Sequence, residues 1–454
     1  MKLKRFIAND VHGYLNFDIQ FREQLTFLIG INGAGKTTAL KLLLAMISPS
    51  FKEFCQIDFS YAELVCSNEQ EIKIVAKKNE SDLILLQLFN GEETIEDKFQ
   101  IVKIEDYEER HNIESYRERL SIYTEKFSEL SIVKKIESFV TPFFLGLERQ
   151  IFDRLTTEER YPLRYRNPRY RNILPSPTNQ GLMEVQELIF DYTRQIARQQ
   201  LRISDEFKNK IFKNSFHFIE NTGTNLDKIE EELPKIEERR NQFNEAIKNL
   251  EIGDVSEEII HFFKRIEETL SKVIEHKPKS DKDKSQQDEF YNYFTKWFIN
   301  SHQLDRIDEV IKLSDNYQKK ISKLKEPIDR LETITNKFLS ESNKSLKVSG
   351  EGDIKILIQK RNKTHVNSIF ELSSGERQIV IMIAHLIFSS NKSKSPIFVI
   401  DEPELSLHIT WQEIFVDSLL AANDTTQYIL ATHSPSIISK VEREALCEDL
   451  TKKA

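Results

Sequence analysis

The sequence is poor in the features that mark secreted, membrane and metal-cluster proteins. It has three cysteines, Cys55, Cys66 and Cys447, whose spacing matches no metal-ligand pattern, and so sparse a set favours a reducing compartment. The best apolar run, 379–388, is about half of a membrane span, so we expect no membrane segment. Residues 1–10 lack the apolar core of a signal peptide, and we therefore expect a cytoplasmic protein.

The chain also lacks an excess of positive charge. Its net charge is −8, which argues against a whole-molecule attraction to nucleic acid or anionic membrane, so any such contact needs a local basic patch. Apolar residues make up 39% and charged residues 30%, a balance typical of a globular protein with solvated helices. The 454 residues are enough for two or three compact units.

Hydrophobic periodicity divides the chain into three predicted parts. Residues 1–155 contain several strand-like runs, which predict a β-rich N-terminal lobe. Residues 156–345 include apolar stripes at spacings of three, four and seven, which predict a helical insertion with a coiled-coil-like hairpin. Because Pro234 and Pro327 interrupt these stripes, we expect no continuous long rod. Strand-like runs return in residues 346–454, which predicts a C-terminal lobe.

Residues 30–37, GINGAGKT, match the phosphate-binding loop pattern and lie between a predicted strand and a predicted helix. Glycines let backbone N–H groups turn toward phosphates, and the N-terminus of the following helix favours an anion. We predict that Lys36 binds the β- and γ-phosphates of ATP and that Thr37 offers its hydroxyl to Mg²⁺. The predicted nucleotide-binding residues of this segment are Asn32, Gly33, Gly35, Lys36, Thr37 and Thr38.

Residues 396–403, PIFVIDEP, form an apolar strand that ends in two acids. We predict that Asp401 holds Mg²⁺ through its water shell and that Glu402 accepts a proton from the attacking water or orients it. Strands often end in acids, so this motif predicts ATP hydrolysis only in combination with the loop at Lys36.

Three further segments resemble motifs of one family. LSSGE at 372–376 resembles the signature of ABC ATPases, and ATHSP at 431–435 resembles their switch-histidine segment. DEPELSLH at 401–408 resembles the variant found in the RecF, OLD and SMC-like branch. The chain thus resembles an ABC/SMC-like ATPase, which implies an α/β fold. In that fold an ABC-type P-loop ATPase head is formed by N- and C-terminal lobes and interrupted by a helical or coiled-coil insertion.

The resemblance implies that one chain's signature faces the ATP bound by another, so the protein would self-associate. Ser373 would bond the γ-phosphate in trans, together with Ser374 and the Gly375 amide, at a helix N-terminus. His433 would contact the γ-phosphate and the attacking water, and the alternative is a structural histidine at a strand end. The role of His408 stays open.

Three features depart from the family pattern or lie outside it. His12 stands where many relatives carry an arginine that reaches the nucleotide. Gln150 is the candidate for the Mg²⁺-sensing glutamine, and the alternative is an ordinary polar residue at a helix start. The Arg-rich loop 160–171 interleaves arginine with tyrosine, a composition suited to DNA phosphates and bases, to an acidic partner protein, or to a solvated loop.

The chain length between motifs bears on the biological role. Lys36 and Ser373 are 337 residues apart, which resembles the SMC and RecF arrangement and not a transporter subunit. Only 21 residues follow His433, too few for the Toprim domain of OLD-type relatives, so we expect any effector to be a separate protein. The chain resembles ATPases of bacterial anti-phage systems of the PARIS and Septu types, which implies control of a separate nuclease or toxin. The alternatives are a RecF-like DNA repair ATPase and a low-turnover scaffold.

Overall fold

The structure is a computed structural model that describes residues 1–67, 70–101, 113–139, 142–145, 151–152, 177–216, 226–250, 256–277, 284–360, 363–388 and 397–452. The chain divides into two compact units. Unit 1 comprises Met1–Tyr192 and Ile328–Ala454, and unit 2 comprises Thr193–Pro327. The two ends of the chain therefore form one unit, and unit 2 falls within the predicted insertion 156–345.

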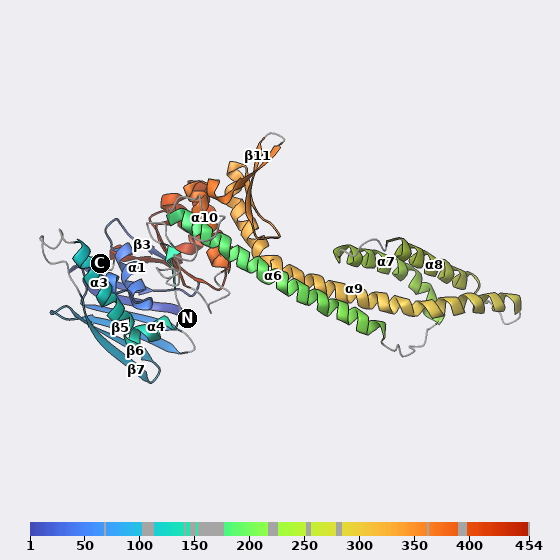
Figure 1. Ribbon diagram of the computed structural model, residues 1–454, viewed down its shortest axis with the longest axis horizontal. Helices are drawn as coiled ribbons and strands as arrows, with labels where there is room; N and C mark the ends of the chain where they lie inside the picture. The colour runs from blue at the N-terminus through green and yellow to red at the C-terminus, as the bar shows by residue number, and fades with distance from the viewer. Residues whose placement is uncertain are drawn as a thin grey trace. The chain divides into compact units, whose positions relative to one another are not determined.

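An antiparallel sheet forms the N-terminal part of unit 1. Its six strands have the order β2-β1-β4-β5-β6-β7. Their bounds are β1 (Lys2–Val11), β2 (Leu15–Gln20), β4 (Tyr61–Ser67), β5 (Glu71–Lys78), β6 (Leu83–Asn90) and β7 (Glu93–Gln100). In β4 and β6 every second residue is buried, because alternate side chains point to opposite faces. Helix α4 (Ser131–Glu137), which follows α3 (Ile113–Ser128), packs on β6 and β7 (Figure 1).

A second, mainly parallel sheet combines strands from both ends of the chain. Its order is β15-β3-β14-β13-β8-β9, and all neighbours are parallel except β8 and β9. The bounds are β3 (Leu25–Ile29), β8 (Phe143–Leu145), β9 (Ile151–Phe152), β13 (Ile397–Asp401), β14 (Gln427–Ala431) and β15 (Cys447–Asp449). Because parallel strands end at the same edge, the segments that follow β3, β13 and β14 meet there.

Two hydrophobic cores cover the two faces of the parallel sheet. The helices of these cores include α1 (Lys36–Ile47), α2 (Phe51–Gln56), α10 (Ser374–Phe388), α11 (Ile409–Ala422) and α12 (Pro435–Ile438). Ile397 and Val399 pack with α1 and the antiparallel sheet, whereas Phe398 and Ile400 pack with α10 and α11. Burial on both faces explains the continuous apolar run of β13. The predicted α/β class is confirmed.

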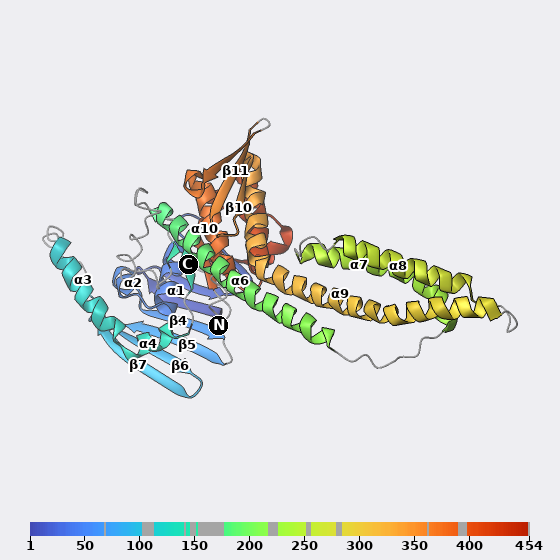
Figure 2. The same cartoon turned by 45° about the vertical axis from the view of Figure 1, so that its right-hand side comes forward.

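A small antiparallel sheet precedes α10 in unit 1. Its order is β10-β11-β12, with bounds β10 (Lys344–Val348), β11 (Ile354–Lys360) and β12 (Lys363–Ser368). Leu346, Ile354 and Ile356 are buried in the core that contains α10. Figure 2 shows β10 and β11 side by side next to α10.

Unit 2 is helical, as predicted for the insertion. It contains η4 (Leu226–Glu231), α7 (Glu232–Asn249), α8 (Ser256–Glu275) and parts of α6 (Pro177–Ser215) and α9 (Lys284–Leu339). Its core gathers Phe263, Leu270 and Trp297. None of the helices in the described ranges is both long and apolar enough to cross a lipid bilayer.

The prediction that prolines exclude a continuous long helix is wrong. Helix α9 runs without interruption over 56 residues with Pro327 inside it, at the residue where unit 2 ends. Proline within a helix costs about 3 kcal/mol. We attribute the continuity to packing, because Leu331 and Phe338 are fully buried in the following turns. Pro234 lies in the first turn of α7, where the missing N–H costs little.

Candidate nucleotide-binding site

Three of the predicted motifs follow neighbouring strands of the parallel sheet. The loop before Lys36 follows β3, Asp401 is the last residue of β13, and His433 comes two residues after β14. Since β3, β14 and β13 are consecutive neighbours in the sheet, the fold brings these segments together at one edge.

The loop backbone requires glycine at two positions. Gly33 and Gly35 have φ values of 87° and 81°, in the left-handed region that residues with a Cβ adopt at a cost. A Cβ on Gly35 would also lie 2.8 Å from side-chain carbons of Leu15 and Phe17. Asn32 and Gly33 are exposed, so the tip of the loop is open to a ligand.

Lys36 is buried at the start of α1. Its Nζ donates to the Gly30 carbonyl at 3.1 Å and contacts the imidazole of His433. Burial lowers the pKa of Lys36 below its ordinary 10.5, although nearby carboxylates, with Glu402 first among them, act in the opposite direction. The ammonium group is thus poorly solvated, and a phosphate anion would stabilise its charge.

Asp401 is the residue whose surroundings best fit a bound cation. Its Oδ2 accepts a hydrogen bond from Thr37 Oγ1 at 2.8 Å, whereas the buried Oδ1 has no hydrogen-bond partner within the described chain. Burial raises the pKa of Asp401, which means that the carboxylate charge is incompletely compensated. Such an oxygen suits Mg²⁺ or a water bound to it. Thr38 lies next along α1 and is half-buried.

The described residues contain no cluster of three or more His, Cys, Asp or Glu that could hold a metal ion.

Glu402 has an unusual backbone conformation. Its φ and ψ are 48° and 59°, and its N–H donates to the Ala431 carbonyl at 2.8 Å. Residues other than glycine adopt this left-handed conformation rarely, and such outliers cluster at functional sites. A carboxylate oxygen of Glu402 lies 3.9 Å from Nε2 of His433, so the two predicted catalytic side chains are neighbours.

Glu404 is a site residue that the sequence did not indicate. Its carboxylate accepts hydrogen bonds from the His433 backbone N–H at 2.6 Å and from Thr432 Oγ1 at 2.8 Å. It thereby holds the turn that carries His433. The only sequence signal was its place two residues after Glu402, and only the fold shows which backbone it contacts.

The signature turn lies at the N-terminus of α10. The Ser373 N–H donates to Glu376 Oε2 at 2.7 Å and the Glu376 N–H contacts Ser373 Oγ at 3.4 Å, a reciprocal capping arrangement. Ser373 and Ser374 are exposed, and Gly375 is partly exposed. Within the described ranges, no hydrogen bond joins this turn to loop 30–38 of the same chain.

Glu376 anchors the turn to the small sheet. Its carboxylate is buried, pairs with Lys344 Nζ at 2.8 Å and accepts from Ser342 Oγ at 3.0 Å. Burial by itself would raise the pKa of Glu376, but Lys344, Ser373 and Ser342 outweigh it and lower the pKa below 4.5.

We expect Glu376→Gln to lower the free energy of unfolding by about 3 kcal/mol at pH 7, since it breaks a buried ion pair. Because the folded pKa is depressed, this stabilisation is present above about pH 4.5 and is lost as the pH falls through the folded pKa. The difference in Tm between variant and wild type should therefore shrink on acidification, as thermal unfolding from pH 7 downward would show. Glu351→Gln, at an exposed position, is the control. A gap in Tm that does not change with pH would contradict the prediction.

The remaining predicted residues lie elsewhere or outside the described ranges. His12 is exposed in the turn after β1, and its backbone N–H donates to the Asp58 carbonyl at 2.9 Å. His408 precedes α11 with Nδ1 3.0 Å from Thr410 Oγ1. Gln150 and the Arg-rich loop 160–171 lie outside the described residues and stay predictions.

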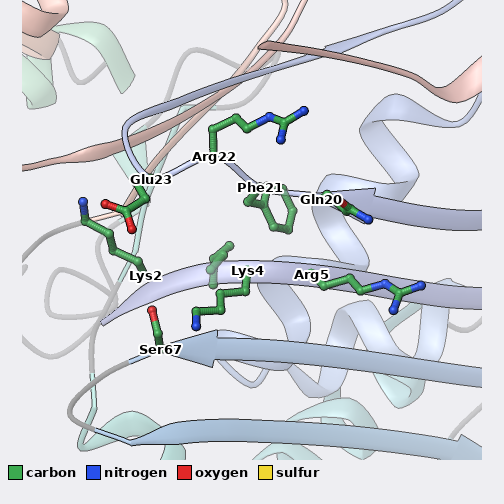
Figure 3. Close-up of a pocket in the computed structure, with 9 residues that line it drawn as sticks. Lys2, Lys4, Arg5, Gln20, Phe21, Arg22, Glu23 and Ser67 are labelled. Atoms are coloured by element: carbon green, nitrogen blue, oxygen red, sulfur yellow. The ribbon is translucent and has the colours of Figure 1, made fainter. Parts of the chain in front are cut away.

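A separate hollow of about 330 Å³ lies beside β1 and β2 (Figure 3). Lys2, Lys4, Arg5 and Arg22 are among its lining residues, and Figure 3 labels their side chains on β1 and on the segment after β2. Arg5 pairs with Asp18 at 2.7 Å. No predicted nucleotide-binding residue lines this hollow, so it is not the nucleotide site.

Comparison with known proteins decides the family. A family profile described as AAA ATPase domain matches residues 1–438. The chain belongs to the AAA ATPase domain family. This AAA ATPase is 33% identical over 88 residues to the Retron Vc95 probable ATPase of Vibrio cholerae serotype O1 biovar El Tor, a match that covers 17% of each chain. It is 27% identical over 150 residues to the Retron Ec83 probable ATPase of Escherichia coli, covering 29% of this chain and 28% of that relative. The matches thus span less than a third of the curated relatives.

Solved structures similar to this AAA ATPase include two SMC heads. The SMC head domain from Thermotoga maritima is 12% identical, with a TM-score of 0.36, and the match covers 99% of this chain and 94% of that one. The Smc head domain with an extended coiled coil bound to the C-terminal domain of ScpA, derived from Pyrococcus furiosus, is 14% identical. Its TM-score is 0.34, with 96% of this chain and 91% of that one covered. We assign the α/β fold of this AAA ATPase from the strand order of its own sheets.

Proposed function

We propose that this AAA ATPase binds and hydrolyses ATP with Mg²⁺ at a site that two chains complete together. The main support comes from the carboxylate of Asp401. One of its oxygens accepts a hydrogen bond from Thr37, and the other is buried and has no hydrogen-bond partner in the described chain. Together with the buried ammonium of Lys36, this carboxylate forms a half-satisfied polar cluster, which is costly unless a ligand completes it. A triphosphate with its cation has the charges that would do so.

Each residue of the site would have a separate role in ATP binding and hydrolysis. The loop amides and Lys36 bind the β- and γ-phosphates, while Thr37 and Asp401 would hold Mg²⁺, which neutralises charge on the phosphates when bound. Glu402 orients the attacking water and accepts its proton. His433, held by Glu404, contacts the γ-phosphate.

The second chain supplies the signature turn in this proposal. Support comes from the exposure of Ser373 and Ser374 at the N-terminus of α10, where backbone N–H groups and the helix dipole favour an anion. Two side chains fix the backbone of the turn. Glu376 accepts a hydrogen bond from the Ser373 N–H, and Arg377 donates one to the Leu372 carbonyl at 2.6 Å. Donors that are held in place before the reaction stabilise a transition state most effectively.

Lys36→Ala tests the nucleotide site directly. We expect at least about a hundredfold loss of ATP hydrolysis, because a buried positive charge on the phosphates is removed. The rise in Tm on adding ATP should be lost as well, and removal of Mg²⁺ with EDTA should stop hydrolysis in the wild type. Lys41→Ala, at an exposed position of the same helix, is the matched control. Wild-type hydrolysis by Lys36→Ala would overturn the proposal.

We further propose that this ATPase is the sensor or scaffold of an anti-phage defence system and controls a separate nuclease or toxin. The motif resemblance to PARIS- and Septu-type ATPases supports this role, as does the similarity to two proteins named retron probable ATPases. Copurification with the product of an adjacent gene would favour it. Hydrolysis that DNA stimulates, with a steep dependence on salt, would instead favour a RecF-like repair ATPase.

A further inference from the structure

The strands β11 and β12 carry a run of positive charge that the nucleotide site does not use. Residues 354–368 contain no acid in a chain whose net charge is −8. The cationic residues of this run within the described ranges are Lys355, Lys360 and Lys363, and His365 accompanies them. A local basic patch of this kind is what an acidic protein needs to contact a polyanion.

The register of the two strands places Lys360 and Lys363 together at one end of the pair, whereas Lys355 lies at the other end, opposite Ser368. Lys360 pairs with Lys363 and Ile358 pairs with His365. Paired residues point to the same face of a sheet, and so do residues two apart, so Lys360, Lys363 and His365 share one face. Like charges directly opposite each other are destabilising, and neither lysine forms an ion pair with another described residue. A bound polyanion would relieve this repulsion.

At the end that carries Lys360 and Lys363, strands β11 and β12 extend beyond β10. The pairing of β10 with β11 begins at Lys344 opposite Ile358, so Lys360 and Lys363 belong to a ribbon of two strands only. Most of β12 is exposed, including Val366 at 60%. In both views β11 runs outward, away from α10 (Figure 1, Figure 2).

We propose that the ribbon formed by β11 and β12 binds duplex DNA. A two-stranded ribbon is one of the elements that the major groove of B-DNA admits, and lysines are suited to the phosphates that line it. The charge complementarity is local, which reconciles DNA binding with the negative net charge of the chain. This inference goes beyond the proposed ATPase function and does not depend on nucleotide.

The double variant Lys360→Gln with Lys363→Gln tests the ribbon without nucleotide. We expect its Kd for a short labelled DNA duplex to rise by at least about tenfold at low salt, and the slope of log K against log salt to fall by about 2, because two phosphate contacts are lost. Fluorescence anisotropy over a salt series measures both. The control is Lys77→Gln with Lys98→Gln, which removes the same charge from exposed positions on β5 and β7.

Three outcomes would overturn the proposal. The first is no measurable binding of duplex DNA by the wild type. The second is a ribbon variant that aggregates but keeps wild-type affinity for DNA, which would mean that the lysines only protect a sheet edge. The third is equal affinity for duplex RNA, whose deep, narrow major groove does not admit side chains. Unchanged Tm values of the two double variants would exclude misfolding as the cause of a loss. Since ATP is absent, failure here leaves the ATPase proposal untouched.

Discussion

Glu402→Gln is expected to reduce ATP hydrolysis by about 10²–10⁴-fold, because an amide cannot accept the proton of the attacking water. ATP binding should persist, since Lys36 and Thr37 are unchanged. The substitution keeps the shape of the side chain, and the hydrogen bond from its backbone N–H to the Ala431 carbonyl does not involve the carboxylate. Steady-state hydrolysis and nucleotide affinity, measured on the same preparation, separate the two effects.

The same variant should accumulate as an ATP-bound assembly of two chains. If the signature turn of one chain completes the site of another, ATP holds the chains together until it is hydrolysed. Light scattering after size-exclusion chromatography, with and without ATP and Mg²⁺, would show the change in mass. Glu413→Gln, at an exposed position of α11, is the control and should behave as the wild type. A Glu402→Gln protein that stays monomeric with ATP at high concentration would contradict a shared site.

Mixing two inactive variants is expected to restore hydrolysis. Lys36→Ala removes the loop lysine, and Ser373→Arg places a bulky side chain on the exposed signature turn. Each protein alone should be inactive. In a mixed pair, the Ser373→Arg chain supplies an intact loop and the Lys36→Ala chain supplies an intact signature turn. One of the two sites therefore has the wild-type composition. An equal mixture with random pairing should recover about one quarter of the wild-type rate.

The mixing experiment separates a shared site from a site within one chain. If the signature turn served its own chain, each chain of the mixture would carry one lesion in its only site and the mixture would stay inactive. Loss of the Ser373 cap destabilises the helix start by about 1 kcal/mol. Circular dichroism and the Tm of Ser373→Arg should therefore be compared with those of Ser373→Ala, which loses the same cap without the added bulk. Recovery that is absent although both variants are folded would contradict the composite site.

Much of the fold follows from local sequence. The strand, loop and helix around Lys36 are where the glycine pattern and the apolar runs predict them. The apolar run before Asp401 predicts a strand that is buried on both faces, and β13 is such a strand. The chemical roles of Lys36, Glu402 and His433 follow from their motifs and stay predictions until the variants are measured.

Contacts between distant segments were not accessible from the sequence. Glu404 holds the backbone of His433, and Glu376 pairs with Lys344, because the fold brings these residues together across long stretches of chain. The continuity of α9 through Pro327 is a tertiary result as well, since the local cost of proline predicts a break. The sequence by itself therefore determined where the strand, loop and helix around Lys36 and the strand before Asp401 lie, and it predicted which side chains carry the chemistry, because motif spacing and periodicity are local properties. Only the tertiary structure decided which groups orient those side chains, because burial and pairing depend on residues that are far apart along the chain.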